Sequence, residues 1–418
     1  MARLVIQGGK KLSGRVRISG SKNAVLPCLV ASLLTKEDVV ITNVPELGDV
    51  VTSCQLLELL GKKIVRSKNK LVITEPHGLT SNAPYELVSK MRASALVMGP
   101  LVVRCGAAEV SLPGGCAIGT RPVDIHLFGL KTLGAEIKIE EGYVKLKAKS
   151  LVGTTVLFPK VSVGATEHII MASVLAEGKT VIKNAAQEPE IVDLADMLNA
   201  MGARIIGAGT PEIYVEGVKN LSSVEHDIIA DRIEAGTFMV AAAITRGRLV
   251  LEKMYTKHLE MLINKLCLSG VEIEKGENSC IVNAEKRKLV PVDIETSPYP
   301  GFATDLQAQW MAYMCTVPGR SVVRETIFEN RFMHVGELQR MGAKVQLDGN
   351  TAIVEGQKNL SGAKVMATDL RASAALVLAG LAAEGCTQVS RIYHLDRGYE
   401  NIEKKLRSVG ANIKRYRR

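Results

Sequence analysis

The chain has 418 residues, of which 47% are hydrophobic and 23% are charged, and its formal net charge is +10. These are ordinary values for a globular protein, and they exclude a disordered, collagen-like or coiled-coil chain. A chain of this length is expected to form two or three domains. The surplus of cations fits a nucleic acid, an anionic membrane surface, a small anionic substrate, or simply a solvated surface rich in lysine.

The aromatic, apolar and cysteine residues reduce the number of possible partners and locations. Only 16 residues are aromatic (1 Trp, 9 Tyr and 6 Phe), whereas proteins that stack nucleic-acid bases usually cluster more of them, so we expect no nucleic-acid partner. The longest apolar run, near 96–103, is too short for a bilayer and the amino terminus lacks a signal-peptide core, so we expect no membrane insertion. The eight cysteines are scattered without a C-x-x-C pair. This pattern favours a reducing, cytoplasmic location and argues against a structural zinc site.

A glycine recurs in six similar segments, each time after an apolar residue or serine and before a small residue and an alternating strand pattern. The six glycines are Gly61, Gly134, Gly202, Gly270, Gly342 and Gly410. Their separations lie between 68 and 73 residues, and this regularity indicates six internal repeats. Because glycine tolerates positive φ, we expect each of them just after the end of a helix.

The repeats share one order of predicted elements. Each has a first amphipathic helix rich in Ala, Leu and Met, and these helices are expected over 24–34, 93–103, 166–175, 235–244, 306–315 and 372–382. β-Branched strands are expected to follow, for example at 39–42, 180–182 and 248–251. A second helix then ends at the repeated glycine, and alternating strands such as 136–139 and 143–146 complete the unit. The sequence therefore predicts an α/β protein with six βαβαββ repeats, three in each of two pseudo-symmetric domains. The strongly apolar helices suggest that the helices pack inside the sheets.

Polar residues recur where the first helix of each repeat begins. Helix capping accounts for the oxygen-bearing side chains among them, namely Ser21, Ser162, Thr304 and Asp369. Capping does not account for Lys22, Arg92 and Arg371, because a cation at a helix N-terminus opposes the helix dipole. A helix N-terminus combined with a cation is instead suited to binding an anion.

The turn before the second helix carries an arginine in three repeats: Arg121, Arg331 and Arg397. Arginine binds phosphate and carboxylate groups through two parallel hydrogen bonds. If the helix N-termini of both domains converge on a cleft, these cations would face one multiply charged anion. Cys116 lies near Arg121 in a Gly- and Pro-rich loop, where it is either an exposed, tuned thiol or an inert loop cysteine.

Eight motifs together resemble the UDP-N-acetylglucosamine 1-carboxyvinyltransferases, a family of enolpyruvyl transferases. They are SGSKN (19–23), PGGCAIGTRPVDIH (113–126), PKVSVGAT (159–166), DRIEAGTF (231–238), TDLQAQ (304–309), ENRFMH (329–334), ATDLRASAALVLAG (367–380) and YHLDRGYE (393–400). The resemblance covers nearly the whole chain. The related 3-phosphoshikimate 1-carboxyvinyltransferases share the six-unit fold but lack the PGGCAIG loop, and they remain the alternative enzyme. A non-catalytic binding paralogue is the alternative outside the enzymes.

The resemblance implies a two-domain inside-out α/β barrel. One domain would span 22–229 and hold the Cys116 loop, and the other would combine 1–21 with 230–418. The family transfers the enolpyruvyl group of phosphoenolpyruvate to the 3-hydroxyl of UDP-N-acetylglucosamine through a tetrahedral ketal and releases phosphate. This is the first committed step of peptidoglycan precursor synthesis. No metal and no cofactor are implied.

The resemblance also implies roles for individual residues. Cys116 would donate a proton to the methylene carbon of phosphoenolpyruvate, form a covalent adduct with it, and be the target of fosfomycin. Asp305 would take the proton of the sugar hydroxyl, and Lys22, Arg121 and Arg397 would clamp phosphoenolpyruvate.

Further substrate contacts follow from the same resemblance. Asn23 would contact the sugar and the intermediate. Two segments would contact the uridine diphosphate: Arg121, Pro122, Val123, Asp124 and Ile125, and Lys160, Val161, Ser162 and Val163. Arg92, Ile327, Arg331 and Arg371 would complete the pocket. Asp369 would either act in catalysis or position Arg371 and Arg397, and His126 and His394 would support the site from behind.

Overall fold

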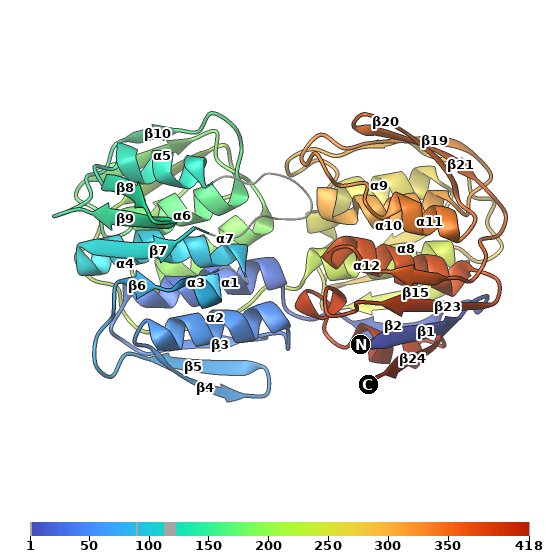
Figure 1. Cartoon of the computed structure of the whole chain (residues 1–418), viewed down its shortest axis with the longest axis horizontal. Helices are drawn as coiled ribbons and strands as arrows, with labels where there is room; N and C mark the ends of the chain where they lie inside the picture. The colour runs from blue at the N-terminus through green and yellow to red at the C-terminus, as the bar shows by residue number, and fades with distance from the viewer. Residues whose placement is uncertain (1, 89–90, 113–122, 418) are drawn as a thin grey trace. The chain divides into compact units, whose positions relative to one another are not determined.

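The computed structural model describes residues 2–88, 91–112 and 123–417, except for the side chain of Arg92. The described chain divides into two compact units (Figure 1). The first unit contains the residues up to Ser19 and those from Ala230 onward. The second unit contains the described residues between Gly20 and Ile229.

The described part of the second unit combines helices with three four-stranded sheets. Its helices are α1 (Lys22–Ala31), η1 (Ser32–Leu34), α2 (Gly48–Leu59), α3 (Tyr85–Val88), η2 (Arg92–Val97), α4 (Met98–Cys105), α5 (Asp124–Thr132), α6 (Val163–Ser173) and α7 (Pro189–Ala200). One sheet has the order β14 (Val224–Asp227), β3 (Val39–Thr42), β5 (Lys70–Thr74) and β4 (Lys63–Ser67). The next has β6 (Asn82–Ala83), β7 (Ala107–Ser111), β9 (Tyr143–Lys147) and β8 (Glu136–Glu140). The last has β10 (Thr155–Leu157), β11 (Lys179–Lys183), β13 (Glu212–Glu216) and β12 (Arg204–Ile206).

The described part of the first unit has the same composition. Its helices are α8 (Arg232–Ile244), η3 (Thr256–Leu259), α9 (Glu260–Leu268), η4 (Thr304–Leu306), α10 (Gln307–Met314), α11 (Val335–Arg340), α12 (Leu370–Ala382), η5 (Leu395–Arg397) and α13 (Ile402–Ser408). One sheet has the order β16 (Glu272–Lys275), β17 (Ser279–Asn283), β15 (Arg248–Glu252) and β2 (Ser13–Arg17). Another has β18 (Ile294–Glu295), β19 (Gly319–Arg324), β21 (Thr351–Gly356) and β20 (Lys344–Asp348). The last has β22 (Lys364–Met366), β23 (Cys386–Ser390), β1 (Arg3–Gln7) and β24 (Asn412–Tyr416).

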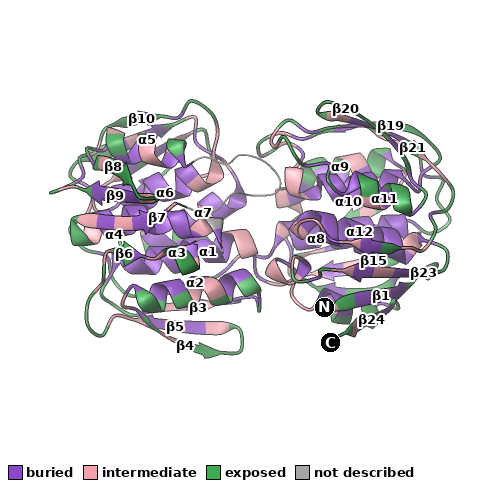
Figure 2. Ribbon diagram, in the orientation of Figure 1, coloured by how far each residue is buried: buried purple, intermediate pink, exposed green. Residues whose placement is uncertain are grey.

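Helices form the interior of each unit, as the sequence predicts. In the first unit α8, α10 and α12 pack against one another, and every residue of α8 after Arg232 is buried. A helix that is apolar on all sides has to be buried on all sides. The strands instead alternate, as in β3, where buried and half-buried residues take turns. Figure 2 shows buried residues along the central helices of each unit and alternating exposure on the strands. None of the helices in the described chain is long and apolar enough to cross a membrane.

The repeated glycines lie where the sequence predicts them. All six have φ between 88° and 109°, and each directly follows the last turn of a second helix. The first helices differ slightly from prediction, because several begin up to three residues earlier than expected. Ser162 and Asp231 each accept a backbone N–H of the first turn, and such a cap fixes where the helix starts.

The strand pairing corrects the picture of six self-contained repeats. β2 precedes α1 in the chain but pairs with β15, and β14 precedes α8 but pairs with β3. β1 lies between β23 and β24, so the N-terminal strand completes the last sheet. Within the described chain, only the sheets spanning 82–147, 155–216 and 294–356 are built from contiguous repeats. Alternation of apolar residues marks a strand but does not identify its partner, so the repeat pattern alone did not reveal the exchange.

Candidate active site

A carboxylate held by two buried arginines forms the centre of the site in the first unit. Asp305, in η4, accepts a hydrogen bond at Oδ1 from Arg331 Nη2 (2.6 Å) and another at Oδ2 from Arg371 Nη2 (2.8 Å). The arginine side chains are 4% and 3% exposed, whereas that of Asp305 is 27% exposed. The carboxylate is therefore anchored from the protein side and reachable from the other. The structure thus brings three sequence-predicted residues together.

Aromatic and amide groups fix the position of Arg371. Burial lowers the pKa of the Arg371 guanidinium, but the neighbouring Asp305, Tyr399 and Asp231 raise it above its ordinary value, so it stays charged. Its Cζ lies 5.4 Å from the centre of the Tyr399 ring. Gln309 Nε2 donates to the Tyr399 hydroxyl (3.1 Å) and to the Asp305 carbonyl oxygen (2.9 Å). These contacts make the arginine part of a fixed scaffold.

Within the described chain, both arginines have buried N–H groups with no hydrogen-bond acceptor. These are Nε of Arg331 and both Nε and Nη1 of Arg371. A buried donor without an acceptor costs about 1–3 kcal/mol, more for a charged group. A bound anion would remove this cost, because guanidinium groups are matched to phosphate and carboxylate oxygens.

Asp369 and Arg397 lie around His394 in the same unit. Asp369 caps α12 by accepting the N–H groups of Arg371 (2.8 Å) and Ala372 (3.1 Å). Burial lowers the pKa of His394, Arg397 lowers it further, and Asp369 opposes both effects. Arg397 ends η5 and is half-buried. The capping role explains Asp369 without requiring that it take part in chemistry.

Ile327 belongs to a turn that is tied down by one buried carboxylate. Glu325, 2% exposed, accepts hydrogen bonds from the backbone N–H groups of Ile327 (2.8 Å) and Phe328 (3.2 Å) at one oxygen. Its other oxygen accepts from the hydroxyl of Thr304 (2.9 Å), next to Asp305. The turn that carries Ile327 and the turn that carries Asp305 are therefore held together.

Lys22 and Asn23 lie at the start of α1 in the second unit. Ser21 caps this helix, and Lys22 Nζ lies 2.8 Å from Asp49 Oδ2 in the first turn of α2. The side chains of Lys22 and Asp49 are 13% and 5% exposed. η2, which begins at Arg92, packs against α1 and α6. The three helices that begin with these sequence-predicted residues thus pack together in this unit.

The two segments predicted to contact uridine diphosphate are adjacent. Val123, Asp124 and Ile125 begin α5, and α5 packs against α6. Lys160 and Val161 precede Ser162, which caps α6 by accepting the Ala165 N–H (3.3 Å), and Val163 begins that helix. Asp124 and Lys160 are exposed, while Ile125 and Val161–Val163 are half-buried.

A histidine pair joins these two helices. His168 Nε2 accepts the backbone N–H of Gly99 (2.7 Å), so its ring proton lies on Nδ1. This Nδ1 is 3.2 Å from His126 Nδ1, which must then accept, so a neutral His126 carries its proton on Nε2. Burial, and then His126, lower the pKa of His168 well below its ordinary value, which agrees with a neutral ring. A side chain at Gly164 would come within 3.4 Å of His126 Nε2, so this N–H lies at the start of α6.

Some predicted residues lie outside the described part of the chain. These are Cys116, Arg121 and Pro122, together with the side chain of Arg92. Their assignments rest on the sequence motifs alone.

Comparison with known proteins decides the family. The profile of the family described as EPSP synthase (3-phosphoshikimate 1-carboxyvinyltransferase) matches residues 6–406. A protein of Carboxydothermus hydrogenoformans named UDP-N-acetylglucosamine 1-carboxyvinyltransferase 2 is 56% identical over 416 residues, 99% of each chain. A Geobacter metallireducens protein named UDP-N-acetylglucosamine 1-carboxyvinyltransferase is 56% identical over 415 residues, again 99% of each chain. The chain belongs to the UDP-N-acetylglucosamine 1-carboxyvinyltransferases, within the EPSP synthase family. It is therefore a transferase.

Solved structures of other enolpyruvyl transferases share the fold. The enolpyruvyl transferase NikO of Streptomyces tendae aligns with a TM-score of 0.88 at 24% identity, over 99% of this chain and 98% of that one. EPSP synthase of Acinetobacter baumannii aligns with a TM-score of 0.77 at 18% identity, over the full length of both chains. The inside-out two-domain α/β fold of this UDP-N-acetylglucosamine 1-carboxyvinyltransferase is thereby confirmed.

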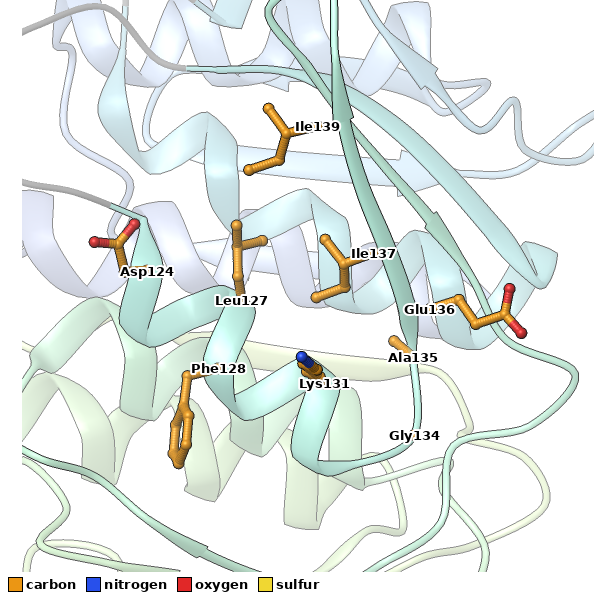
Figure 3. Close-up of a pocket in the computed structure, with 9 residues that line it drawn as sticks. All are labelled: Asp124, Leu127, Phe128, Lys131, Gly134, Ala135, Glu136, Ile137 and Ile139. Carbon is orange, nitrogen blue, oxygen red and sulfur yellow. The ribbon is translucent and has the colours of Figure 1, made fainter.

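A shallow pocket of about 680 Å³ lies between α5 and β8 of this transferase (Figure 3). Asp124 stands at one end of it, and Phe128, Ile137 and Ile139 provide apolar walls. Among the sequence-predicted site residues, only Asp124 lines this pocket, so the hollow does not define the active site.

The structure adds supporting residues that sequence reasoning missed. Gln309 and Tyr399 lie inside the TDLQAQ and YHLDRGYE motifs, and the i to i+4 spacing of Asp305 and Gln309 on helical backbone was a usable signal. Asp49 and His168 carried no such signal, because their partners Lys22 and His126 are distant in the chain.

Proposed function

We propose that this chain transfers the enolpyruvyl group of phosphoenolpyruvate to the 3-hydroxyl of UDP-N-acetylglucosamine and releases phosphate. The observation that carries the proposal is the Asp305 carboxylate, anchored by two buried guanidinium groups and still partly exposed. Full-length identity of 56% to proteins that bear the name of this activity supports it.

Asp305 is the proposed base. Each of its oxygens accepts one arginine N–H, and the side chain remains 27% exposed, so a sugar hydroxyl can reach it from solvent. The arginine pair fixes the orientation of the carboxylate. General base catalysis of this kind contributes about 10²–10⁴-fold to the rate. Once the proton moves to Asp305, the sugar oxygen bonds to the carbon of phosphoenolpyruvate that bears the phosphate.

Cys116 is the proposed acid, which protonates the methylene carbon in the same step. The resulting tetrahedral ketal then loses a proton from the new methyl group and expels phosphate, which restores the carbon–carbon double bond. Lys22, Arg121 and Arg397 are proposed to hold the phosphate and carboxylate of phosphoenolpyruvate, and Arg331 and Arg371 to support the pocket. Fixed cations stabilise the charge of the ketal without reorganisation.

The remaining predicted contacts are proposed to bind the nucleotide sugar. Asn23, at the start of α1, is assigned to the sugar, and the α5 and α6 N-termini to the diphosphate, because backbone N–H groups there favour anions. Contacts are also proposed for Ile327, whose turn is tied to that of Asp305 through Glu325. Arg92 and Pro122 are assigned by motif.

Two wider roles follow from the proposed reaction. Its product would be the first committed precursor of peptidoglycan, which links the chain to cell-wall synthesis, cell shape and division, and Cys116 to fosfomycin. We also propose a cytoplasmic location, since the seven cysteines of the described chain are free thiols and free thiols persist in a reducing compartment.

The second candidate acceptor is shikimate 3-phosphate, because the matching family profile is described by that activity. The two readings separate in one assay that measures phosphate release from phosphoenolpyruvate with either acceptor. We expect phosphate release when the acceptor is UDP-N-acetylglucosamine and none when it is shikimate 3-phosphate. Release only with shikimate 3-phosphate would reverse the assignment, and release with neither acceptor would contradict both proposed functions.

Asp305→Asn provides the residue-level control in this assay. It should lower kcat by about 10²–10⁴-fold, because an amide cannot take the hydroxyl proton. Asp348→Asn changes an exposed carboxylate at the end of β20 and should leave the rate unchanged. Equal rates for the two variants would remove the base role of Asp305.

A further inference from the structure

A cysteine, an aspartate and a histidine from three separate elements meet inside the second unit. Cys28 lies in α1, Asp193 in α7 and His226 in β14, and α7 packs against both other elements. The sulfur of Cys28 is 3.9 Å from Asp193 Oδ2, and His226 Nε2 is 3.1 Å from Asp193 Oδ1. One ligand atom from each of the three lies within 4.8 Å of the other two.

These separations are close to those of a tetrahedral zinc site. With Zn–S near 2.3 Å and Zn–N and Zn–O near 2.0–2.2 Å, neighbouring ligand atoms of a tetrahedron stand about 3.3–3.6 Å apart. The observed separations of 3.9 Å and 3.1 Å run to different oxygens of Asp193, and one ligand atom of each residue lies within 4.8 Å of the other two. Binding an ion would therefore draw the Cys28 and His226 side chains toward one Asp193 oxygen.

The donors and their surroundings also match such an ion. Thiolate, imidazole and carboxylate are the three zinc ligand types, and a fourth position is commonly filled by water. Cys28 and Asp193 are 0% and 3% exposed, while the His226 side chain is 13% exposed and leaves a route from solvent. Glu167 and Asp196 lie near this group, so further carboxyl groups surround the position of the ion.

We propose that Cys28, Asp193 and His226 bind one divalent ion of the zinc class. The ion would replace the Cys28–Asp193 and His226–Asp193 hydrogen bonds with coordinate bonds, and the thiol proton would pass to the buffer. It would join α1, α7 and β14, and α1 begins with Lys22 and Asn23. The site is structural and separate from the transfer reaction. A search for closely spaced cysteines cannot find it, because its ligands are distant in the chain.

The test uses the full chain, reduced and stripped of metal with a chelator, and titrates it with Co²⁺ or Zn²⁺ alone. Cobalt reports directly, because a cobalt–thiolate bond gives a charge-transfer absorption. Cys28→Ser and His226→Gln remove a ligand yet keep a hydrogen-bond donor toward Asp193. Cys280→Ser is the matched control, since Cys280 is an equally buried cysteine on β17 of the other unit.

We expect the unmodified chain and Cys280→Ser to bind one equivalent of cobalt with the charge-transfer band, and zinc to raise their Tm. Cys28→Ser should lose the band, and His226→Gln should bind roughly 10-fold more weakly or worse, the loss that even outer-shell partners cause. If Cys28→Ser fails to fold, His226→Gln still decides. Absence of the band in the unmodified chain, or an undiminished band in the two ligand variants, would overturn the proposal.

Discussion

Three described cations of the proposed site are paired with carboxylates. Lys22 is paired with Asp49, and Arg331 and Arg371 share Asp305. Removing one partner of such a buried pair is costly, because the other charge remains without compensation. An anionic substrate therefore meets cations that are oriented in advance rather than mobile side chains.

Cys116 allows a prediction that separates acid from nucleophile. Cys116→Ala should lose about 10²–10⁴-fold of the phosphate-release rate, because the general acid is absent. Cys116→Asp should lose less, since a carboxyl group can still donate a proton, and it should resist fosfomycin, since it attacks an epoxide poorly. The rates and the mass of the fosfomycin-treated peptide that contains Cys116 check both statements. A label on another cysteine would contradict the assignment.

The histidine pair gives a prediction about binding. His168→Leu removes the group that makes His126 Nδ1 an acceptor and its Nε2 a donor. Losing one oriented hydrogen bond costs about 0.5–1.5 kcal/mol, so KM for UDP-N-acetylglucosamine should rise about 2- to 10-fold. KM for phosphoenolpyruvate should stay the same and kcat should change little. A change in both KM values would point to a wider distortion of the site, and no change would show that the histidine pair does not orient the groups that bind the nucleotide sugar.

At the scale of single residues, the sequence motifs identified candidate site side chains but not the residues that contact them. Asp305, Arg331 and Arg371 lie in three different motifs, and the structure joins them. The sequence did not identify Asp49 and His168 as supporting residues, because each contacts a site residue that is distant in the chain. Chemical type and local spacing are readable from a sequence, whereas a tertiary contact requires the fold.

Elements follow local chemistry closely in this chain. The repeated glycines end the second helices, and caps such as Ser162 and Asp369 begin the first helices. Strand pairing was beyond local chemistry, because β1, β2 and β14 complete sheets of distant repeats. A strand's alternation fixes which side chains face inward but not which edge it joins.

Two glycines of one helix test this reading of helix ends. Gly342 follows α11 with φ of 88°, and Gly336 lies within α11 without positive φ; a side chain at either would meet no atom within 4 Å. Gly342→Ala should lower the free energy of unfolding by about 1–2 kcal/mol, because left-handed backbone is strained for alanine. Gly336→Ala should raise it by about 0.5–1 kcal/mol through helix propensity. Denaturant unfolding measures both, and a neutral or stabilising Gly342→Ala would contradict the helix-end role.

At the scale of the whole molecule, the period of the sequence repeat was enough to predict the architecture. Six spaced glycines and strongly apolar helices indicated two domains with helices inside, and the buried central helices of each unit agree (Figure 2).

The net charge of +10 has no single explanation. Arg331 and Arg371 are buried beside Asp305 in the proposed site. Other cations form exposed pairs, such as Lys70 with Glu225, that contribute little to stability.

The structure of the product tests the central claim most directly. Purified protein is incubated with phosphoenolpyruvate and UDP-N-acetylglucosamine, and the nucleotide sugar is isolated and examined by mass spectrometry and proton NMR. We predict one added enolpyruvyl group per molecule, with vinyl protons and an ether bond at the 3-oxygen of the sugar. An unchanged nucleotide sugar, or an enolpyruvyl group at another position, would contradict the account.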